Sequence, residues 1–143
     1  MNTLELKNLL VAHLQRIDGR TSPWSSYEFY YDVHREVYAQ LLFFNDINSF
    51  PCICFTVENE RIIHAEGGQR FMSVSIEMRG YTYDEDVEES GELLAQDIEH
   101  VLAYIRREDR RLEDIRLLEI NTDSGMNAPH GACILKIEAL FRR

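Results

Sequence analysis

Hydrophobic residues recur every three or four positions in two segments of this chain, which is the spacing of one face of an α-helix. The first segment covers residues 3–18 and ends at Asp18-Gly19, where glycine accepts the left-handed conformation that stops a helix. The second covers about residues 87–106. The two apolar stripes consist of Leu6, Leu9, Leu10, His13, Leu14 and Ile17, and of Leu94, Ile98, Val101, Leu102 and Ile105.

Hydrophobic and polar residues alternate in five further segments, and this period of two predicts half-buried strands. The clearest covers residues 70–83, where one face holds Met72, Val74, Ile76 and Met78 and the other is mostly polar. The remaining segments are residues 27–34, 51–57, 115–122 and 132–141. Pro51 stands at the start of its strand, where its missing N–H does least harm.

Polar and glycine-containing stretches separate these segments. We expect a turn at Glu58-Asn59-Glu60, a loop over residues 61–69 and a long turn from Asn121 to Gly131. Residues 36–50 fit either a continued strand or a short helix. The two long loops, residues 61–70 and 121–131, fit either surface disorder or contact arms that order against a neighbouring subunit.

Together these elements predict an α+β fold, with a single mixed or antiparallel sheet of about four to six strands and two main helices packed on it. A chain of 143 residues fits one domain, so we expect residues 1–143 to form a single unit. No apolar run reaches the roughly 18 residues that span a bilayer, and residues 1–10 lack a signal pattern. We therefore expect no membrane partner and synthesis in a cytoplasm.

The formal net charge of −10 predicts that the chain repels nucleic acid, because duplex binding needs Lys and Arg against phosphates. Of the 15 basic residues 13 are arginine, whose planar guanidinium suits contacts with carboxylates at interfaces. Acidic charge combined with arginine favours a protein that works through contacts with other proteins.

Residues with catalytic potential form no recognisable set. No serine stands in a Gly-x-Ser-x-Gly elbow, and Gly67-Gly68 is too short to cradle a phosphate. Metal-dependent nucleases often place a lysine two residues after a strand carboxylate, whereas here Lys136 precedes Glu138. We therefore expect a protein that is not an enzyme and binds no cofactor.

The cysteines, Cys52, Cys54 and Cys133, are odd in number, which favours buried thiols in a reducing compartment over a disulfide framework. Cys52 and Cys54 share one side of a strand, but no second Cys/His pair has the spacing of a zinc site. We therefore expect no metal.

An acidic run from Asp84 to Glu99 contains eight carboxylates and no basic residue. It fits a divalent-metal site or a DNA mimic, but we favour the start and solvated face of a helix. Acids near a helix N-terminus each stabilise it by about 0.3–1 kcal/mol. The run also lacks the Asp-x-Asp-x-Asp-Gly spacing of a calcium loop.

The order of elements over about residues 4–141 resembles the tail terminator proteins of long-tailed bacteriophages, also called tail completion or minor tail protein U-like proteins. The resemblance rests on a leading helix, an early strand, the Pro-opened strand Pro51-Cys-Ile-Cys-Phe-Thr-Val57 and the long alternating strand at residues 70–83. An Asp/Glu-led helix follows, then a strand, a Pro-containing loop and the final strand His130-Gly-Ala-Cys-Ile-Leu-Lys-Ile-Glu-Ala-Leu-Phe141.

This resemblance implies a small α+β structural subunit of the virion tail, assembled in the host cytoplasm. It implies a hexameric ring that caps the tail tube, stops its growth and provides the surface for head–tail joining. The implied partners are further copies of the chain, the tail tube protein and the head–tail connector protein. DNA would only pass through an acidic lumen, which does not bind phosphate.

A ring interface joins two different patches. The candidate positive patch, here called the arginine cluster, consists of Arg106, Arg107, Arg110, Arg111 and Arg116, and the candidate negative patch consists of Asp84, Glu85 and Asp86. Other classes stay open: an acidic DNA mimic or inhibitor that binds a host nucleic-acid enzyme, a small-molecule enzyme, or a different phage connector protein.

Overall fold

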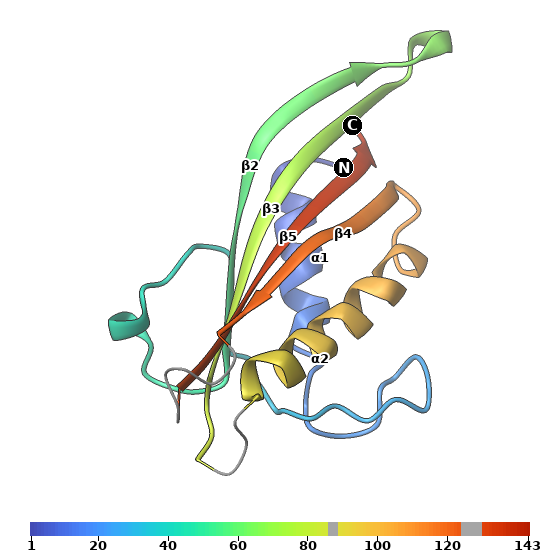
Figure 1. The fold of residues 1–143 in the computed structure, drawn as a ribbon. Coiled ribbons are helices and arrows are strands. Elements are labelled where there is room, and N and C mark those ends of the chain that lie inside the picture. The colour runs from blue at the N-terminus through green and yellow to red at the C-terminus, as the bar shows by residue number, and fades with distance from the viewer. Residues whose placement is uncertain (86–88, 124–129) are drawn as a thin grey trace.

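The computed structural model describes residues 1–85, 89–123 and 130–143. It shows one five-stranded sheet with two α-helices against one of its faces (Figure 1). The elements are α1 (Thr3–Leu14), β1 (Val37–Tyr38), β2 (Cys52–His64), β3 (Arg70–Tyr83), α2 (Ser90–Tyr104), β4 (Leu112–Thr122) and β5 (His130–Arg142), with short 3-10 turns at Phe44–Asp46, Glu66–Gly68 and Ile105–Arg107. The predicted α+β fold with a mixed sheet and two main helices is confirmed.

The strand order is β1-β2-β3-β5-β4. β1 runs parallel to β2, while all other neighbours are antiparallel. β3 and β5 pair along their whole shared length, from Phe71 opposite Arg142 to Tyr83 opposite His130. The long β3 therefore lies near the middle of the sheet, and β4 forms one edge.

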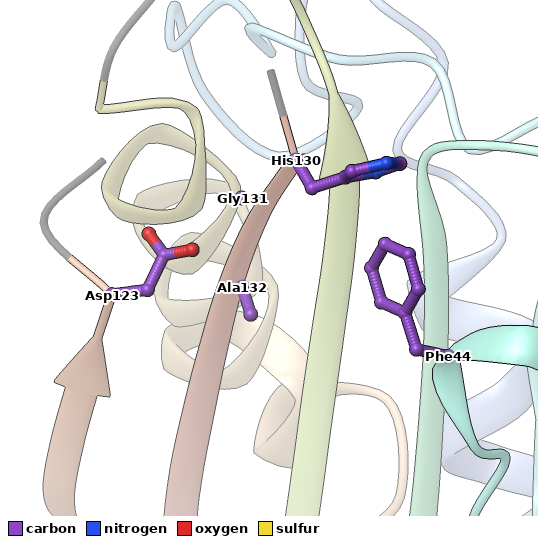
Figure 2. A pocket seen from close by; sticks show the side chains of 5 residues that line it. All are labelled: Phe44, Asp123, His130, Gly131 and Ala132. Carbon is purple, nitrogen blue, oxygen red and sulfur yellow. The ribbon is translucent and has the colours of Figure 1, made fainter. Parts of the chain in front are cut away.

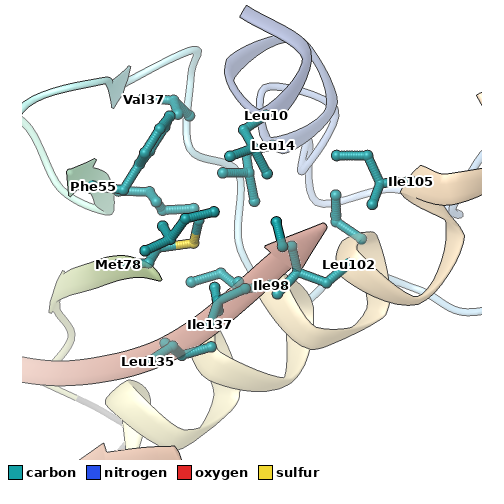
Figure 3. Packing of buried hydrophobic residues seen from close by; sticks show 14 of the residues in the cluster. Leu10, Leu14, Val37, Phe55, Met78, Ile98, Leu102, Ile105, Leu135 and Ile137 are labelled. Atoms are coloured by element: carbon teal, nitrogen blue, oxygen red, sulfur yellow. The ribbon is translucent and has the colours of Figure 1, made fainter. Parts of the chain in front are cut away.

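The register places apolar side chains on one face of the sheet in continuous rows. Met78 lies opposite Leu135 and Ile76 opposite Ile137, and all four are buried. The stripes of α1 and α2 cover these rows, with Leu10, Leu14, Ile98 and Leu102 converging on the strands (Figure 3). The predicted inward face of residues 70–83 is confirmed, because Met72, Val74, Ile76 and Met78 are all buried.

The predicted strand over residues 27–34 is wrong. This segment forms only two isolated bridges, Asp18 with Asp32 and Thr21 with Glu28. Its alternation still predicts which side chains face the core, because Phe29 and Val33, two positions of the same predicted face, are buried.

A fully buried carboxylate on α2 holds this segment in addition to its backbone hydrogen bonds with residues 17–22. Oδ1 of Asp97 accepts hydrogen bonds from the hydroxyl of Tyr27 at 2.7 Å and from the backbone N–H of Tyr30 at 3.1 Å, and Oδ2 accepts from the N–H of Tyr31 at 3.0 Å. Burial raises the pKa of the Asp97 carboxyl, and these three donors oppose that rise. The expectation that the acidic run is solvated on the helix face is therefore wrong for Asp97.

The predicted turn at residues 58–60 is also wrong. β2 continues to His64, with a shift in register between Glu58 and Arg61 and a positive φ at Asn59. The reversal comes at residues 65–69, where Gly67 and Gly68 both have φ of +77°. α1 ends at Leu14 rather than at residue 18, and α2 ends at Tyr104 rather than at about residue 106, whereas the predicted start of the second helix at Val87 lies outside the described residues. β4 begins at Leu112 rather than at residue 115.

We predict that Asp97→Asn lowers the free energy of unfolding by about 1–3 kcal/mol. An amide can accept only through one of its two positions, so at least one of the three donors loses its partner in a buried site. Urea unfolding measures the change. Glu99→Gln, an exposed position two residues further along α2, is the matched control, and equal stability of the two variants would contradict the role given to Asp97.

Candidate functional site

The predicted charged patches lie at opposite ends of α2. The arginine cluster follows the C-terminal end of the helix and reaches into β4, whereas Asp84 and Glu85 lie between β3 and the start of α2 (Figure 1). Asp86 falls outside the described residues. A helix of 15 residues is about 22 Å long, so one subunit does not bring the two patches together.

Most of the arginine cluster already has partners within the subunit. Arg111 binds Glu5 of α1 at 2.6 Å and Asp109 at 2.9 Å, and Arg116 binds Asp114 at 2.6 Å. The Arg111 hydrogen bond holds the pKa of Glu5 below its usual range. These contacts tie α1 and the turn before β4 together.

The other three members of the cluster, Arg106, Arg107 and Arg110, have weaker contacts within the subunit or none with a carboxylate. Arg106 reaches Asp114 at 3.8 Å, and the guanidinium of Arg107 lies 4.8 Å from the ring centre of Tyr104. Arg110 is exposed and forms no ion pair with any residue that the structure describes. Arg107 is exposed as well and has no ion pair among the described residues, so the charges of Arg107 and Arg110 are both available to another molecule.

The two described acids of the negative patch accept hydrogen bonds from tyrosines. Oδ2 of Asp84 lies 3.3 Å from the Tyr31 hydroxyl, and Oε1 of Glu85 lies 3.1 Å from the Tyr83 hydroxyl. Burial, with a smaller contribution from the Asp84 charge, raises the pKa of Tyr31 to about 12. Glu85 is nonetheless exposed, so its charge faces solvent.

A hollow of about 300 Å³ lies at one end of β5, lined by Phe44, Asp123, His130, Gly131 and Ala132. Figure 2 shows the His130 ring turned toward Phe44 and away from Asp123, so the imidazole and the carboxylate do not face each other. Nδ1 of His130 is buried without a hydrogen-bond partner among the described residues. The arrangement is an aromatic contact, with ring centres 4.5 Å apart, rather than an acid–base pair.

The three cysteines are free and buried, as expected. Burial raises the pKa of Cys52 and of Cys133 to about 12 and raises that of Cys54 as well. Within residues 1–85, 89–123 and 130–143, no three His, Cys, Asp or Glu side chains gather as metal ligands would. None of the described helices is both long and apolar enough to cross a membrane.

Sequence reasoning missed two exposed apolar sites at opposite edges of the sheet. Leu118 on β4 is 60% exposed, and Ile62 near the end of β2 is 47% exposed. Leu4 of α1, at 65%, is also exposed. The signal was present in the sequence as the adjacent pairs Ile62-Ile63 and Leu117-Leu118, which break strict alternation and put one apolar side chain on each face.

A family profile described as Bacteriophage Tail Tube Terminator Protein matches residues 7–142. The chain belongs to this family. It is a structural protein of the phage tail, and the predicted resemblance is confirmed. One similar solved structure is a chain from the virion of a native gene transfer agent particle, with a TM-score of 0.40, 11% identity, and coverage of 76% of this chain and 79% of that chain. No curated protein matches the chain.

We predict that the thiols of this tail tube terminator resist labelling in the native state. A pKa of about 12 leaves about a thousandfold less thiolate at pH 8 than the usual value near 9. Absorbance with a disulfide reagent should show release of three thiols per chain only after urea is added. A Ser75→Cys variant, with its thiol on the exposed sheet face, is the reactive control, and rapid native labelling without that substitution would contradict the burial.

Proposed function

We propose that this terminator closes into a hexameric ring that caps the tail tube, stops its growth and provides the surface for joining the head. Its partners in that role are identical subunits, the tail tube protein and the head–tail connector protein. Assembly takes place in the host cytoplasm and ends in the virion tail. Family membership supports the position at the end of the tube, and the surfaces of the chain support the ring.

The observation that carries the ring is the separation of unlike surfaces on one subunit. A closed ring needs a heterologous contact, in which one patch meets a different patch on the next copy. The arginine cluster, with Arg110 unpaired among the described residues, lies at one end of α2, and Asp84 and Glu85 lie at the other. The predicted pairing of these two patches between subunits is one candidate for this heterologous contact, and the ring does not depend on that particular pairing.

The charge of the chain fits a ring through which DNA passes. Six copies carry a formal charge of about −60, six times the −10 of one chain. Negative walls repel phosphate, so DNA would move through the lumen without being held. The proposed contact with DNA is therefore passage rather than binding.

The alternative of a DNA mimic receives less support from the described acids. A mimic needs carboxylates in an exposed line, whereas Asp97 is fully buried and Asp84 is half-buried. The acidic run thus contributes partly to the interior of the subunit.

The first test is the solution mass by light scattering over a range of concentration and salt. We expect a species of about 101 kDa, six times the 16.8 kDa of one chain, or a concentration-dependent approach to it. A monomer at every concentration, with purified tail tubes also failing to recruit it, would contradict the proposal.

We further predict that Arg110→Glu weakens assembly about five- to tenfold at low salt, with a smaller effect at high salt. The substitution places a negative charge opposite an acidic surface of the neighbouring subunit, which repels it. Salt screens this repulsion. The change is read as a shift of the assembly midpoint in light scattering. Arg20→Glu makes the same charge change at an exposed position outside the cluster and outside β4, and an equal shift in both variants would argue against a role for the cluster.

A further inference from the structure

We propose that neighbouring subunits of the ring join edge to edge, with residues 55–64 of β2 in one copy pairing antiparallel with β4 of the next. This inference rests on the proposed function, because it needs a ring. It names the contact that the ring would use, and it selects a different acidic partner for the arginine cluster.

Both strands have an edge that no other described strand occupies. β1 pairs with β2 only at Ile53 and Cys54, so none of the described strands pairs with the outer edge of β2 from Phe55 to His64. β4 is the last strand of the sheet on the other side, and it pairs only with β5. Unpaired backbone N–H and C=O groups on a long exposed edge are a template for pairing with another chain.

The strand directions fit such a contact. β2 and β5 both run antiparallel to β3, and β4 runs antiparallel to β5, so β2 and β4 point in opposite directions. Rotation about an axis along the strands keeps these directions. β4 of one copy would therefore meet β2 of the next as an antiparallel pair.

Residues that lie opposite one another on neighbouring strands form rows across the sheet. On the face away from the helices, here called the open face, two such rows end in opposite charges. One row runs from Arg116 on β4 through Glu138 and Ser75 to Glu58 on β2. The adjacent row begins at Asp114 on β4 and ends at Arg61 on β2. If each row continues into the next subunit, Arg116 meets Glu58 and Asp114 meets Arg61. Neither Glu58 nor Arg61 forms an ion pair with another residue that the structure describes.

The helix-covered face offers apolar partners in the same register. Its rows start on β4 at Leu112, Leu117 and Ile120 and end on β2 at Ile62, Val57 and Phe55 respectively. Continued rows would therefore place Ile62 opposite Leu112 and Ile120 opposite Phe55. Leu112 and Phe55 are already buried within the subunit, so the surface that the contact covers belongs to the exposed Ile62 and Ile120. Cross-strand pairs of this kind are the unit of sheet stabilisation.

A shift of β2 by one row along β4 of the neighbouring subunit, in either direction, would bring like charges together. One shift brings Arg116 opposite Arg61 and Glu119 opposite Glu58, and the other brings Asp114 opposite Glu58. Like charges directly opposite each other destabilise a sheet, so the charge pattern selects the continued register.

The acids Asp84 and Glu85 fit this contact less well than Glu58. They follow Tyr83, which is about 8 residues along β3 from Ser75 in the row of Arg116, and about 11 residues from Met72 in the row of Leu112. At about 3.3 Å per residue, adjacent subunits would have to be staggered by about 26–36 Å for these acids to reach the cluster. Edge pairing needs no such stagger.

Cysteine cross-linking tests the proposed contact in the full-length protein. Glu58 and Arg116 lie three strand spacings apart within one subunit, about 14 Å, which is too far for an internal disulfide. We expect mild oxidation of the Glu58→Cys, Arg116→Cys double variant to give a ladder up to a covalent hexamer on non-reducing gels. The Glu85→Cys, Arg116→Cys variant is the matched control and should give no ladder.

The outcomes separate this inference from the ring itself. Hexamers by light scattering that show no ladder, or a ladder in the Glu85 control instead, overturn edge pairing and leave the ring standing. A protein that stays monomeric at every concentration, gives no ladder and is not recruited by purified tail tubes overturns both.

A charge swap gives an independent readout without new thiols. Glu58→Arg and Arg116→Glu should each weaken assembly about tenfold, and the combined variant should recover to within about threefold of the original. Because Arg116 also pairs with Asp114 inside the subunit, urea unfolding of each variant checks that the monomer is intact. Recovery by Glu85→Arg in place of Glu58→Arg would overturn the inference.

Discussion

The pairing of β3 with β5 is the interaction on which the rest of this structure depends. It joins two long strands from separate parts of the chain over residues 71–83 and 130–142, and it lines up their apolar residues on one face. Both helices pack against those rows. β2 and β4 then attach to the outer sides of this central pair, so their own outer sides remain at the edges of the sheet.

The helices cover one face of the sheet, and this leaves the other face polar and the two edges without strand partners in the described structure. The described residues supply strand edges, exposed apolar side chains and unpaired charges. Those features suit association between identical copies. The charges on the open face also alternate from row to row, which gives an association between strands a preferred register.

The segment between α1 and β1 shows how a buried polar group can replace regular structure. Residues 27–34 have the alternation of a strand, yet the backbone donors of Tyr30 and Tyr31 bind Asp97 rather than a neighbouring strand. Aromatic rings from this segment and from α2 pack together, including Tyr27 and His100 with ring centres 4.2 Å apart. The carboxylate and the rings together fix a segment that also forms backbone hydrogen bonds with residues 17–22.

Local periodicity and hydrophobicity are enough to predict the class of the fold, both helical stripes, the inward face of residues 70–83 and the burial of the cysteines. The order of elements along the chain also indicates the tail terminator family. In contrast, the folded chain was needed to show that β5 lies between β3 and β4, that Asp97 is buried, and that Arg106, Arg111 and Arg116 have partners within the subunit. These facts depend on contacts between residues far apart in the chain, which local patterns do not encode. The same is true of the free edges, since a strand becomes an edge only through the positions of the other strands.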